Sequence, residues 1–312
     1  MVAWPSGKAE ACKASIPQFE SGCHLFITNE PPHGGSFFYM LYIIATPIGN
    51  LADITYRAIE TLKSCDYILC EDTRHSGILL HHYQISKSLK SFHKFSEASK
   101  QTEIIADLQQ GLTIGLISDA GTPGISDPGE KLIQACIENG IEVIAIPGAC
   151  AAITALCCSG LNTDRFQFIG FLPKKASELQ RTLDSILGYP GTTICYESPH
   201  RLLNVLEAIH ASAPQRSIAV ARELTKKFEE LKRGTAQELL AHWKDHTLKG
   251  EIVLLISGHS LENSQDWQSM TPLQHVEHMR TTFDLTLQEA IYAVAKERGV
   301  SKRDIYNAVH RS

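Results

Sequence analysis

Three short polar clusters, at residues 71–74, 197–201 and 222–226, each follow an apolar run of the kind that forms a β-strand. Their carboxylates and histidine could act as general bases, and their arginines and lysine could bind phosphate. A helix cap or a surface ion pair explains any one of these clusters better than catalysis does. All three follow strands, however, and ligands bind at the carboxyl ends of the strands in open α/β sheets. Their shared position therefore favours a common cleft.

The most distinctive segment is SDAGTPGISDPG, residues 118–129, which directly follows the apolar run 113–117. Glycine is entropically costly in a helix or strand, and proline removes a backbone donor, so this composition predicts a long, shaped loop. A plain connection between two elements is normally shorter. The loop is therefore interpreted as a ligand-binding loop at the end of a buried strand.

Two more Gly/Pro turns have the same setting. Residues 47–50 follow the apolar run 41–45, and residues 147–149 follow the run 142–146. After the first turn, apolar residues recur at helical spacing, with Asp53 as the expected N-cap. Backbone N–H groups in such turns can bind a small polar ligand without charged side chains. One such turn would be an ordinary strand-to-helix connection, but three together favour a pocket.

Strands and helices alternate from residue 41 onward, which predicts a mostly parallel sheet. The expected strands are residues 41–45, 67–70, 113–117 and 143–146 in the first half, and 166–171, 192–196, 217–221 and 252–257 in the second. The expected helices of the second half are residues 177–187, 201–211 and 235–244. After a polar linker at 260–270, helical patterns at 271–280, 286–298 and 302–310 enclose a turn at 299–301 and resemble a helix-turn-helix. This tail is interpreted equally as a packing appendage or as an RNA contact.

Composition limits the classes of protein that remain. The chain has 312 residues and a net charge of −5, so bulk charge does not indicate a nucleic-acid partner. Its nine cysteines include no CxxC pair, which favours a reducing cytosol without structural zinc. Residues 143–161 carry no charge, but Pro147 and Gly148 interrupt them, so a strand, a turn and a buried helix are expected instead of a membrane span. Residues 1–39 suggest a disordered tail or an upstream extension.

Seven motifs occur in one order along the chain: ATPIGNLADIT at 45–55, CEDTR at 70–74, SDAGTPGISDPG at 118–129, IPGA at 146–149, YESPHR at 196–201, RELTK at 222–226 and GEIVLLISG at 250–258. Together they resemble the ribosomal RNA small subunit methyltransferase I family, a branch of the tetrapyrrole methylase superfamily. The resemblance runs from about residue 40 to residue 258, and the C-terminal helices are similar to that family's tail. Residues 1–39 lie outside it.

The resemblance implies an enzyme that uses S-adenosylmethionine to methylate the ribose 2′-hydroxyl of a cytidine in the decoding region of small-subunit (16S) rRNA. It implies an α/β fold of two α/β domains with the cofactor cleft between them, plus a small C-terminal helical appendage. The expected boundaries are 1–39 for the extension, 40–160 and 161–259 for the two domains, and 260–312 for the linker and tail. The expected setting is a cytoplasmic homodimer that acts on the small-subunit rRNA or the 30S subunit, with no membrane and no metal.

The cofactor residues implied by the resemblance lie in the three Gly/Pro segments. They are Pro47, Gly49, Asn50, Ser118, Asp119, Ala120, Gly121, Thr122, Pro123, Pro147, Gly148 and Ala149. The first turn reads Pro-Ile-Gly-Asn where tetrapyrrole enzymes usually carry a Gly-Asp turn, and this departure argues against a corrin substrate.

A ribose hydroxyl is a poor nucleophile, so a base or a cation should assist its attack. The candidates are Glu197, His200, Glu223 and Lys226, and the sequence does not rank them. Phosphate contacts are expected from Arg74, Lys174, Lys175, Arg201 and Lys227, and also from Lys226, Lys232 and Arg233.

Two alternatives stay open. The first is a related methyltransferase that acts on a tetrapyrrole or a protein side chain, although the basic residues at 174–175 and 222–233 favour RNA. The second is a non-catalytic RNA-binding or assembly module, which the intact Gly/Pro turns disfavour.

Overall fold

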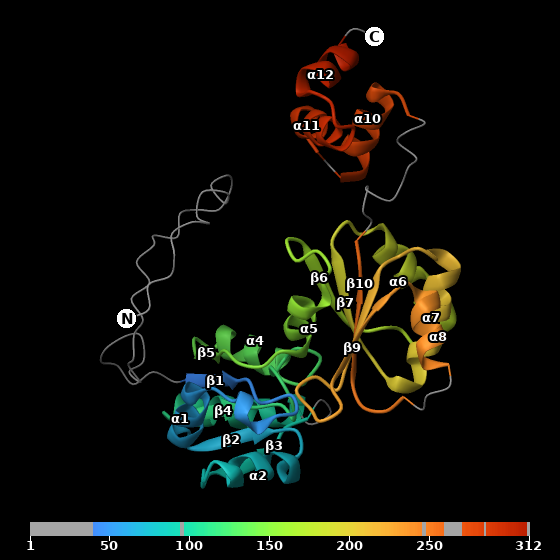
Figure 1. Cartoon of the computed structure of the whole chain (residues 1–312). Helices are drawn as coiled ribbons and strands as arrows, with labels where there is room; N and C mark the ends of the chain where they lie inside the picture. The colour runs from blue at the N-terminus through green and yellow to red at the C-terminus, as the bar shows by residue number, and fades with distance from the viewer. Residues whose placement is uncertain (1–39, 94–96, 245–247, 259–269, 284, 311–312) are drawn as a thin grey trace, which may run out of the picture. The chain divides into compact units, whose positions relative to one another are not determined.

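The computed structural model describes residues 40–93, 97–244, 248–258, 270–283 and 285–310 (Figure 1), all within the compact unit Phe37–Ser312. The expectations for residues 1–39 and most of the linker lie outside the described residues. The described strands form two five-stranded sheets. The predicted domain boundary at 160/161 falls between α5 (Ala151–Ser159) and β6 (Phe166–Phe171), that is, between the two sheets.

The first sheet is entirely parallel, with strand order β3-β2-β4-β1-β5. Its strands are β1 (Met40–Ile44), β2 (Tyr67–Cys70), β3 (Ser88–Ser91), β4 (Ile114–Leu116) and β5 (Glu142–Ile146). The central strands are buried on both faces, which explains their continuous apolar sequences. The register places Leu41 opposite both Ile114 and Val143.

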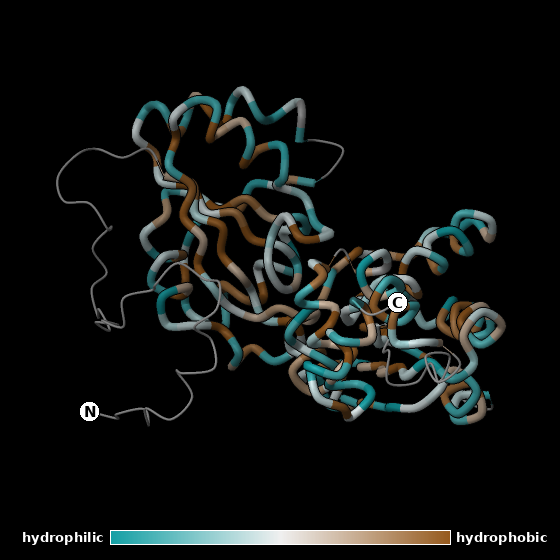
Figure 2. Tube along the Cα trace, turned by 90° about the horizontal axis from the view of Figure 1, so that it is seen from above, coloured by the Kyte–Doolittle hydropathy of each residue, from teal (hydrophilic) through white to brown (hydrophobic). Residues whose placement is uncertain are grey.

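Two helices cover each face of this sheet. On one face α1 (Tyr56–Ser64) and α2 (Thr73–His82) pack around Ile44 and Ile68. On the other, α3 (Glu97–Gln109) and α4 (Glu130–Glu138) pack around Leu41 and Leu69. Alternate residues of one strand therefore serve opposite cores, as the pleat of a strand requires. Figure 2 shows these strands largely in the colour of hydrophobic residues, whereas the helices also carry hydrophilic positions.

The second sheet is mixed, with strand order β6-β7-β10-β8-β9. Its further strands are β7 (Thr192–Glu197), β8 (Ile218–Arg222), β9 (Glu230–Gly234) and β10 (Ile252–Ile256). Only β6 and β7 pair in parallel, because β10 runs antiparallel between β7 and β8, and β9 returns antiparallel along β8. The prediction of a mostly parallel sheet is therefore correct for the first half and wrong for the second.

Different helices cover the two faces of the second sheet. On one face lie α6 (Ala176–Gly188), α7 (Pro199–Ser212) and α8 (Ala236–Trp243), around a core that includes Leu206 and Trp243. On the opposite face lies α5, whose Ala155 and Leu156 pack against Ile194. Helix α5 follows the last strand of the first sheet, so it connects the two halves.

Two strands and one cap differ from the sequence prediction. Strands β3 and β9 were missed because each is an edge strand with a polar sequence, SLKS and ELKRG. Asp53 is not the N-cap of α1, because it ends a short 3-10 helix, Leu51–Asp53. The cap is Thr55, whose hydroxyl accepts a hydrogen bond from the Ala58 N–H (3.1 Å).

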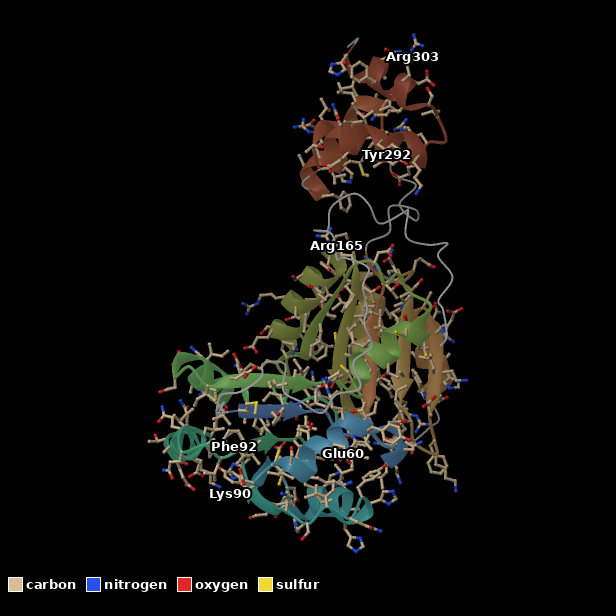
Figure 3. The ribbon with its side chains drawn as sticks, turned by 90° about the vertical axis from the view of Figure 1, so that its left-hand side faces the viewer. Glu60, Lys90, Phe92, Arg165, Tyr292 and Arg303 are labelled. Carbon is tan, nitrogen blue, oxygen red and sulfur yellow. The ribbon has the colours of Figure 1, made fainter. Side chains whose placement is uncertain are left out.

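The C-terminal helices α10 (Pro272–Phe283), α11 (Leu287–Glu297) and α12 (Lys302–His310) contact one another around a small core of their own. Val276, Ile291 and Ile305 belong to this core. Tyr292 and Arg303, both labelled in Figure 3, are exposed on these helices. Within the part of the chain that the structure describes, no helix is both long and apolar enough for a membrane span.

Candidate active site

Hydrogen bonds join the three Gly/Pro segments to one another. Thr46, at the end of β1, and Gly121 exchange two backbone bonds (2.8 and 3.0 Å). The buried Thr46 hydroxyl also donates to the Ser118 carbonyl oxygen (3.1 Å). The third segment joins through the Thr122 hydroxyl, which donates to the Ala149 carbonyl oxygen (3.3 Å). The three turns therefore form one connected rim at the carboxyl edge of the first sheet.

Glycine is required at two positions of this rim. Gly121 has a φ of +79°, and a Cβ there would lie 3.4 Å from Ile48 Cγ2. At Gly148, a Cβ would lie 2.9 Å from the Cβ of Ala45, closer than real Cβ atoms approach. Both positions let the turns approach each other without side chains between them.

The first turn also meets the second half of the chain. A Cβ at Gly49 would collide with the side chain of Lys226 and lie 2.9 Å from Thr225 Oγ1. Glu223 and Thr225 both have positive φ, 53° and 65°, so the turn that follows β8 is held in a strained shape. The close approach of Gly49 to Thr225 and Lys226 therefore joins the rim to the turn that follows β8.

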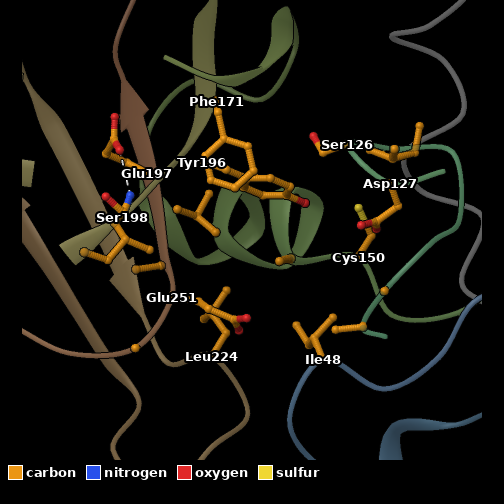
Figure 4. A pocket seen from close by; sticks show the side chains of 18 of the residues that line it. Ile48, Ser126, Asp127, Cys150, Phe171, Tyr196, Glu197, Ser198, Leu224 and Glu251 are labelled. Carbon is orange, nitrogen blue, oxygen red and sulfur yellow. Dashed lines mark hydrogen bonds between the residues drawn. The ribbon is translucent and has the colours of Figure 1, made fainter. Parts of the chain in front are cut away.

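A cavity of about 360 Å³ lies where the rim faces the second sheet (Figure 4). The first half contributes Ile48, residues 119–122 and 125–127, Cys150 and Ala151. The second half contributes Phe171, residues 196–199, Ala221, Leu224 and residues 250–253. Both halves of the chain are thus needed to form it.

Aromatic side chains form part of the second-sheet wall. The rings of Phe171 and Tyr196 meet edge to face with centroids 5.7 Å apart, and 61% of Phe171 is exposed. Burial, with a smaller contribution from Cys150, raises the pKa of Tyr196 to about 12. The hydroxyl of Tyr196 therefore stays protonated at neutral pH and can donate a hydrogen bond.

Four carboxylates line the cavity, and three of them accept a hydrogen bond from a donor. Asp119 Oδ1 accepts from the Asp72 N–H (3.1 Å). Glu251 Oε2 accepts from Lys226 Nζ (2.9 Å). Glu197 Oε1 accepts from the Ser198 N–H (2.7 Å) and lies 3.4 Å from Arg201 Nη1.

Asp127 is the fourth carboxylate, and it has no hydrogen bond or ion pair within the described residues. Burial and, to a smaller extent, the negative charges of Glu71, Asp119 and Glu251 together raise its pKa to about 6. Figure 4 shows its carboxylate pointing into the cavity beside Cys150. An unpaired acid of this kind can exchange a proton near neutral pH.

Of the predicted catalytic residues, Glu197 lines the cavity, with a fully buried side chain whose Oε2 has no hydrogen-bond partner. His200 is exposed and is not part of the lining. Lys226 donates to both Glu223 Oε1 and Glu251 Oε2 (2.9 Å each). Burial alone would lower the pKa of Lys226, but these bonds raise it above its ordinary value, so Lys226 stays a cation. Glu223, which accepts this bond, is likewise outside the lining.

The predicted cofactor residues divide into two groups. Asp119, Ala120, Gly121 and Thr122 line the cavity. The others belong to the same connected rim without lining it: Pro47, Gly49, Asn50, Ser118, Pro123, Pro147, Gly148 and Ala149. Sequence reasoning missed Asp127, Cys150, Phe171, Tyr196 and Glu251. Most of these stand in or beside the seven motifs, whereas Phe171 is marked only as an aromatic residue at the end of a strand.

The predicted phosphate-binding residues are dispersed. Arg74 is exposed and paired with Asp72, and Lys175 is paired with Glu178. Lys174 and Arg201 line a second hollow, between α6 and α7. Lys227 is exposed, with its Nζ 5.6 Å from the centre of the Phe228 ring. The remaining two contact the protein itself: Lys232 lies 3.8 Å from Glu230, and Arg233 donates to the carbonyl oxygens of Ser159 and Cys158.

Comparison with known proteins identifies the family. A model of the Tetrapyrrole (Corrin/Porphyrin) Methylases matches residues 40–240. The ribosomal RNA small subunit methyltransferase I of Halalkalibacterium halodurans is 46% identical over 275 residues, which cover 87% of this chain and 94% of that one. The protein of the same name from Escherichia coli O157:H7 is 44% identical and covers 85% of this chain and 93% of its own. This chain belongs to the ribosomal RNA small subunit methyltransferase I family, within the tetrapyrrole methylases.

The family and the fold class predicted from the motifs are therefore confirmed. Solved structures agree on the fold: a diphthine synthase covers 71% of this chain and 91% of its own with TM-score 0.54 and 14% identity. A uroporphyrin-III-C-methyltransferase of Thermus thermophilus covers 70% and 94%, with TM-score 0.52 and 18% identity. At these identities the likeness shows the fold alone.

The methyl donor of this family is S-adenosylmethionine. The cavity suits this cofactor, because its carboxylates favour a cationic sulfonium and its aromatic and aliphatic residues suit an adenine ring. Gly121 has no side chain, so a ligand can approach its backbone where a Cβ would lie in contact with Ile48. In the described stretches, no group of three or more His, Cys, Asp or Glu residues is arranged to hold a metal ion.

Proposed function

We propose that this protein methylates the ribose 2′-hydroxyl of a cytidine in the decoding region of small-subunit (16S) rRNA. The observation that carries the proposal is the cavity in which the connected Gly/Pro rim of the first sheet faces the aromatic and acidic wall of the second. The names of relatives 44–46% identical to this chain support the rRNA substrate.

In this proposal the rim residues 119–122, with the neighbouring turns 47–50 and 147–149, hold the cofactor through backbone groups. The bound sulfonium supplies an activated methyl group. The protein then has to hold the acceptor oxygen in line with that methyl group and exclude water, and such alignment lowers the barrier by several kcal/mol.

Phe171 is the proposed platform for the acceptor nucleotide. Its ring is 61% exposed at the cavity, and its edge-to-face contact with Tyr196 fixes its position. Proteins bind unstacked bases of single-stranded RNA on aromatic rings of this kind. Phe171 would thus hold the base while the ribose enters the cavity.

Positioning roles suit three of the predicted catalytic residues better than direct attack. Glu197 holds Ser198 and Arg201, whose guanidinium also donates to the carbonyl oxygens of Leu172 (3.0 Å) and Pro173 (2.6 Å). Lys226 and Glu223 hold Glu251, which directly precedes β10 on the same second-sheet wall. His200 is left for contact with RNA, since it is exposed near the hollow that contains Lys174 and Arg201.

A cytoplasmic homodimer that binds rRNA phosphates through Arg74, Lys174, Lys175, Arg201 and Lys227 is part of the same proposal. The resemblance of the motifs supports the homodimer and the compartment. The exposure of Arg74, Lys174 and Lys227 supports the phosphate contacts, because such side chains can reach a large ligand.

Mass spectrometry of rRNA nucleosides from cells with and without the protein tests the proposal. We expect 2′-O-methylcytidine to disappear from small-subunit rRNA when the protein is absent and to return when it is restored. A Gly121→Val protein is the matched control, because we expect it not to restore the modification. An unchanged nucleoside profile contradicts the proposal and favours a tetrapyrrole substrate, a protein substrate or a non-catalytic role.

A further inference from the structure

Proton transfer from the acceptor hydroxyl requires a group in the cavity that is free to accept it. A carboxylate that is already bonded to a cation or to a backbone N–H is a weaker base, because those bonds stabilise its charged form. Glu197 and Glu251 each contact a cation, Arg201 and Lys226 respectively. Asp119 accepts a hydrogen bond from a backbone N–H. Only Asp127 among the four lining carboxylates has no such donor within the described residues.

The backbone around Asp127 is held in a defined shape. Ser126, the residue before it, has a φ of +69°, which is unusual for a residue with a side chain. Gly129 has a φ of +134°, and a Cβ there would lie 2.8 Å from Leu116 Cδ2. Strain of this kind persists where the surrounding structure imposes it, and it gathers at functional sites. The backbone shape of the loop therefore sets the position from which the Asp127 side chain extends.

We propose that Asp127 accepts the proton of the acceptor ribose hydroxyl during methyl transfer. This inference rests on the proposed function. The proton moves from the 2′-oxygen to a carboxylate oxygen of Asp127. The 2′-oxygen then forms its bond to the methyl carbon as the methyl–sulfur bond of the donor breaks, and the electron pair of that bond stays on sulfur. Asp127 finally releases the proton to solvent.

The surroundings of Asp127 support this role. Burial and the charges of Glu71, Asp119 and Glu251 raise the pKa of Asp127 to about 6. The hydroxyl of Tyr196 and the thiol of Cys150 line the same cavity. A base works best when its pKa lies near the working pH, so Asp127 is a stronger base than an ordinary aspartate and is still ionised at neutral pH.

Asp127 could instead bind the cofactor through its charge, and the test separates these roles. The variants are Asp127→Asn, which keeps the shape and removes the base, and Asp127→Glu, which keeps a base. Asp164→Asn is the matched control, because Asp164 is an exposed carboxylate outside the cavity lining. Single-turnover methylation of 30S subunits is measured against pH, and the affinity for S-adenosylhomocysteine is measured by calorimetry.

We expect the Asp127→Asn protein to bind S-adenosylhomocysteine within about twofold of the wild type, and to lose about 10²- to 10³-fold in the rate of methyl transfer. The wild-type rate should fall with decreasing pH below about 6, whereas the residual rate of the variant should not. Asp127→Glu should restore part of the rate, and Asp164→Asn should behave as the wild type.

A tenfold or greater loss of S-adenosylhomocysteine affinity in Asp127→Asn overturns the inference and assigns Asp127 to the cofactor. An unchanged rate, or an unchanged pH profile, also overturns it. If the wild-type protein binds S-adenosylhomocysteine but methylates no rRNA, the proposed function itself is contradicted. This result differs from the others because the methylation activity is then absent in the wild type and not only in the variant.

Discussion

The cavity has two walls, one from the first sheet and one from the second, and their carboxylates differ in the partners that they contact. On the wall from the second sheet, Glu197 and Glu251 are each paired with a cation. On the wall from the first sheet, Asp119 has only a backbone donor, and Asp127 has none within the described residues. Paired carboxylates have a fixed charge and a fixed position, whereas an unpaired one can change its charge. This difference supports the proposed roles, in which the paired carboxylates of the second wall keep its shape beside the acceptor nucleotide and the first wall binds the cofactor and accepts the proton.

The largest expected effect is on cofactor affinity and comes from placing a side chain in the first wall. Gly121→Val should reduce the affinity for S-adenosylhomocysteine more than 100-fold, about 3 kcal/mol. The substitution places a branched side chain at a φ of +79° and next to Ile48. Calorimetric titration measures the affinity directly.

Gly140→Val is the matched control for this prediction. Gly140 has a similar φ of +67°, but nothing lies within 4 Å of a Cβ placed there. The control therefore carries the same backbone strain outside the cavity. If both variants lose affinity equally, general destabilisation is the cause and the cavity assignment is wrong.

Breaking an ion pair of the second wall should lower the stability of the folded protein. Glu197→Ala should lower the free energy of unfolding by about 3 kcal/mol, because it leaves the partly buried Arg201 without its carboxylate partner and removes the acceptor of the Ser198 N–H. Urea denaturation measures this change. Glu197→Gln keeps an acceptor for Ser198 and should lose less. Equal stability of Glu197→Ala and the wild type would show that the second wall does not depend on this pair.

The sequence predicted the first wall better than the second. The three Gly/Pro turns can be predicted from the sequence, because glycine and proline determine the conformation of the backbone locally. Asp127 lies in the loop 118–129, but the sequence does not predict it as a site residue. Its proposed role depends on the absence of a hydrogen-bond or ion-pair partner among the described residues, which only the folded structure reveals.

The second wall depends on contacts between residues far apart in the chain. Phe171 becomes part of the site because β6 lies beside β7, which places Phe171 next to Tyr196 near the end of β7. The insertion of β10 between β7 and β8 brings Glu251 to the cavity, and no local pattern indicates that order. Likewise, the edge strands β3 and β9 were missed because their pairing, and not their composition, makes them strands.

Phe171 tests whether the second wall contacts the acceptor. Phe171→Ala should weaken binding of an rRNA fragment about tenfold, since stacking on an aromatic ring contributes about 1–3 kcal/mol per base, and it should leave the affinity for S-adenosylhomocysteine unchanged. Fluorescence anisotropy of labelled RNA measures the first quantity. Phe166→Ala is the control at the other end of the same strand, where the side chain is 43% exposed. Equal RNA affinity in the two variants would contradict the platform.

The pH dependence of stability probes the unpaired carboxylate independently of activity. The pKa of Asp127 is raised to about 6 in the folded protein, against about 4 in an unfolded chain. Between about pH 4 and pH 6 the unfolded chain releases this proton and the folded protein keeps it, so the folded state loses stability over this range and the loss is complete above about pH 6. Asp127→Asn should melt at a higher temperature than the wild type at neutral pH, and the two should converge below about pH 4. Differential scanning calorimetry at several pH values measures the gap, and a gap that is constant with pH would contradict the raised pKa.

The smallest effect is expected from the C-terminal helices, whose described residues form a core separate from either wall. Val276, Ile291 and Ile305 pack with one another, and the basic residues Lys302 and Arg303 are exposed. Deletion of residues 260–312 should therefore leave the affinity for S-adenosylhomocysteine unchanged and weaken RNA binding severalfold, because a few phosphate contacts are lost. Lys302→Glu combined with Arg303→Glu in the full chain should reproduce most of that loss, and the loss should shrink at high salt. Methylation of 30S subunits at the wild-type rate by the truncated protein would leave the helices with a packing role and confine RNA recognition to the two walls.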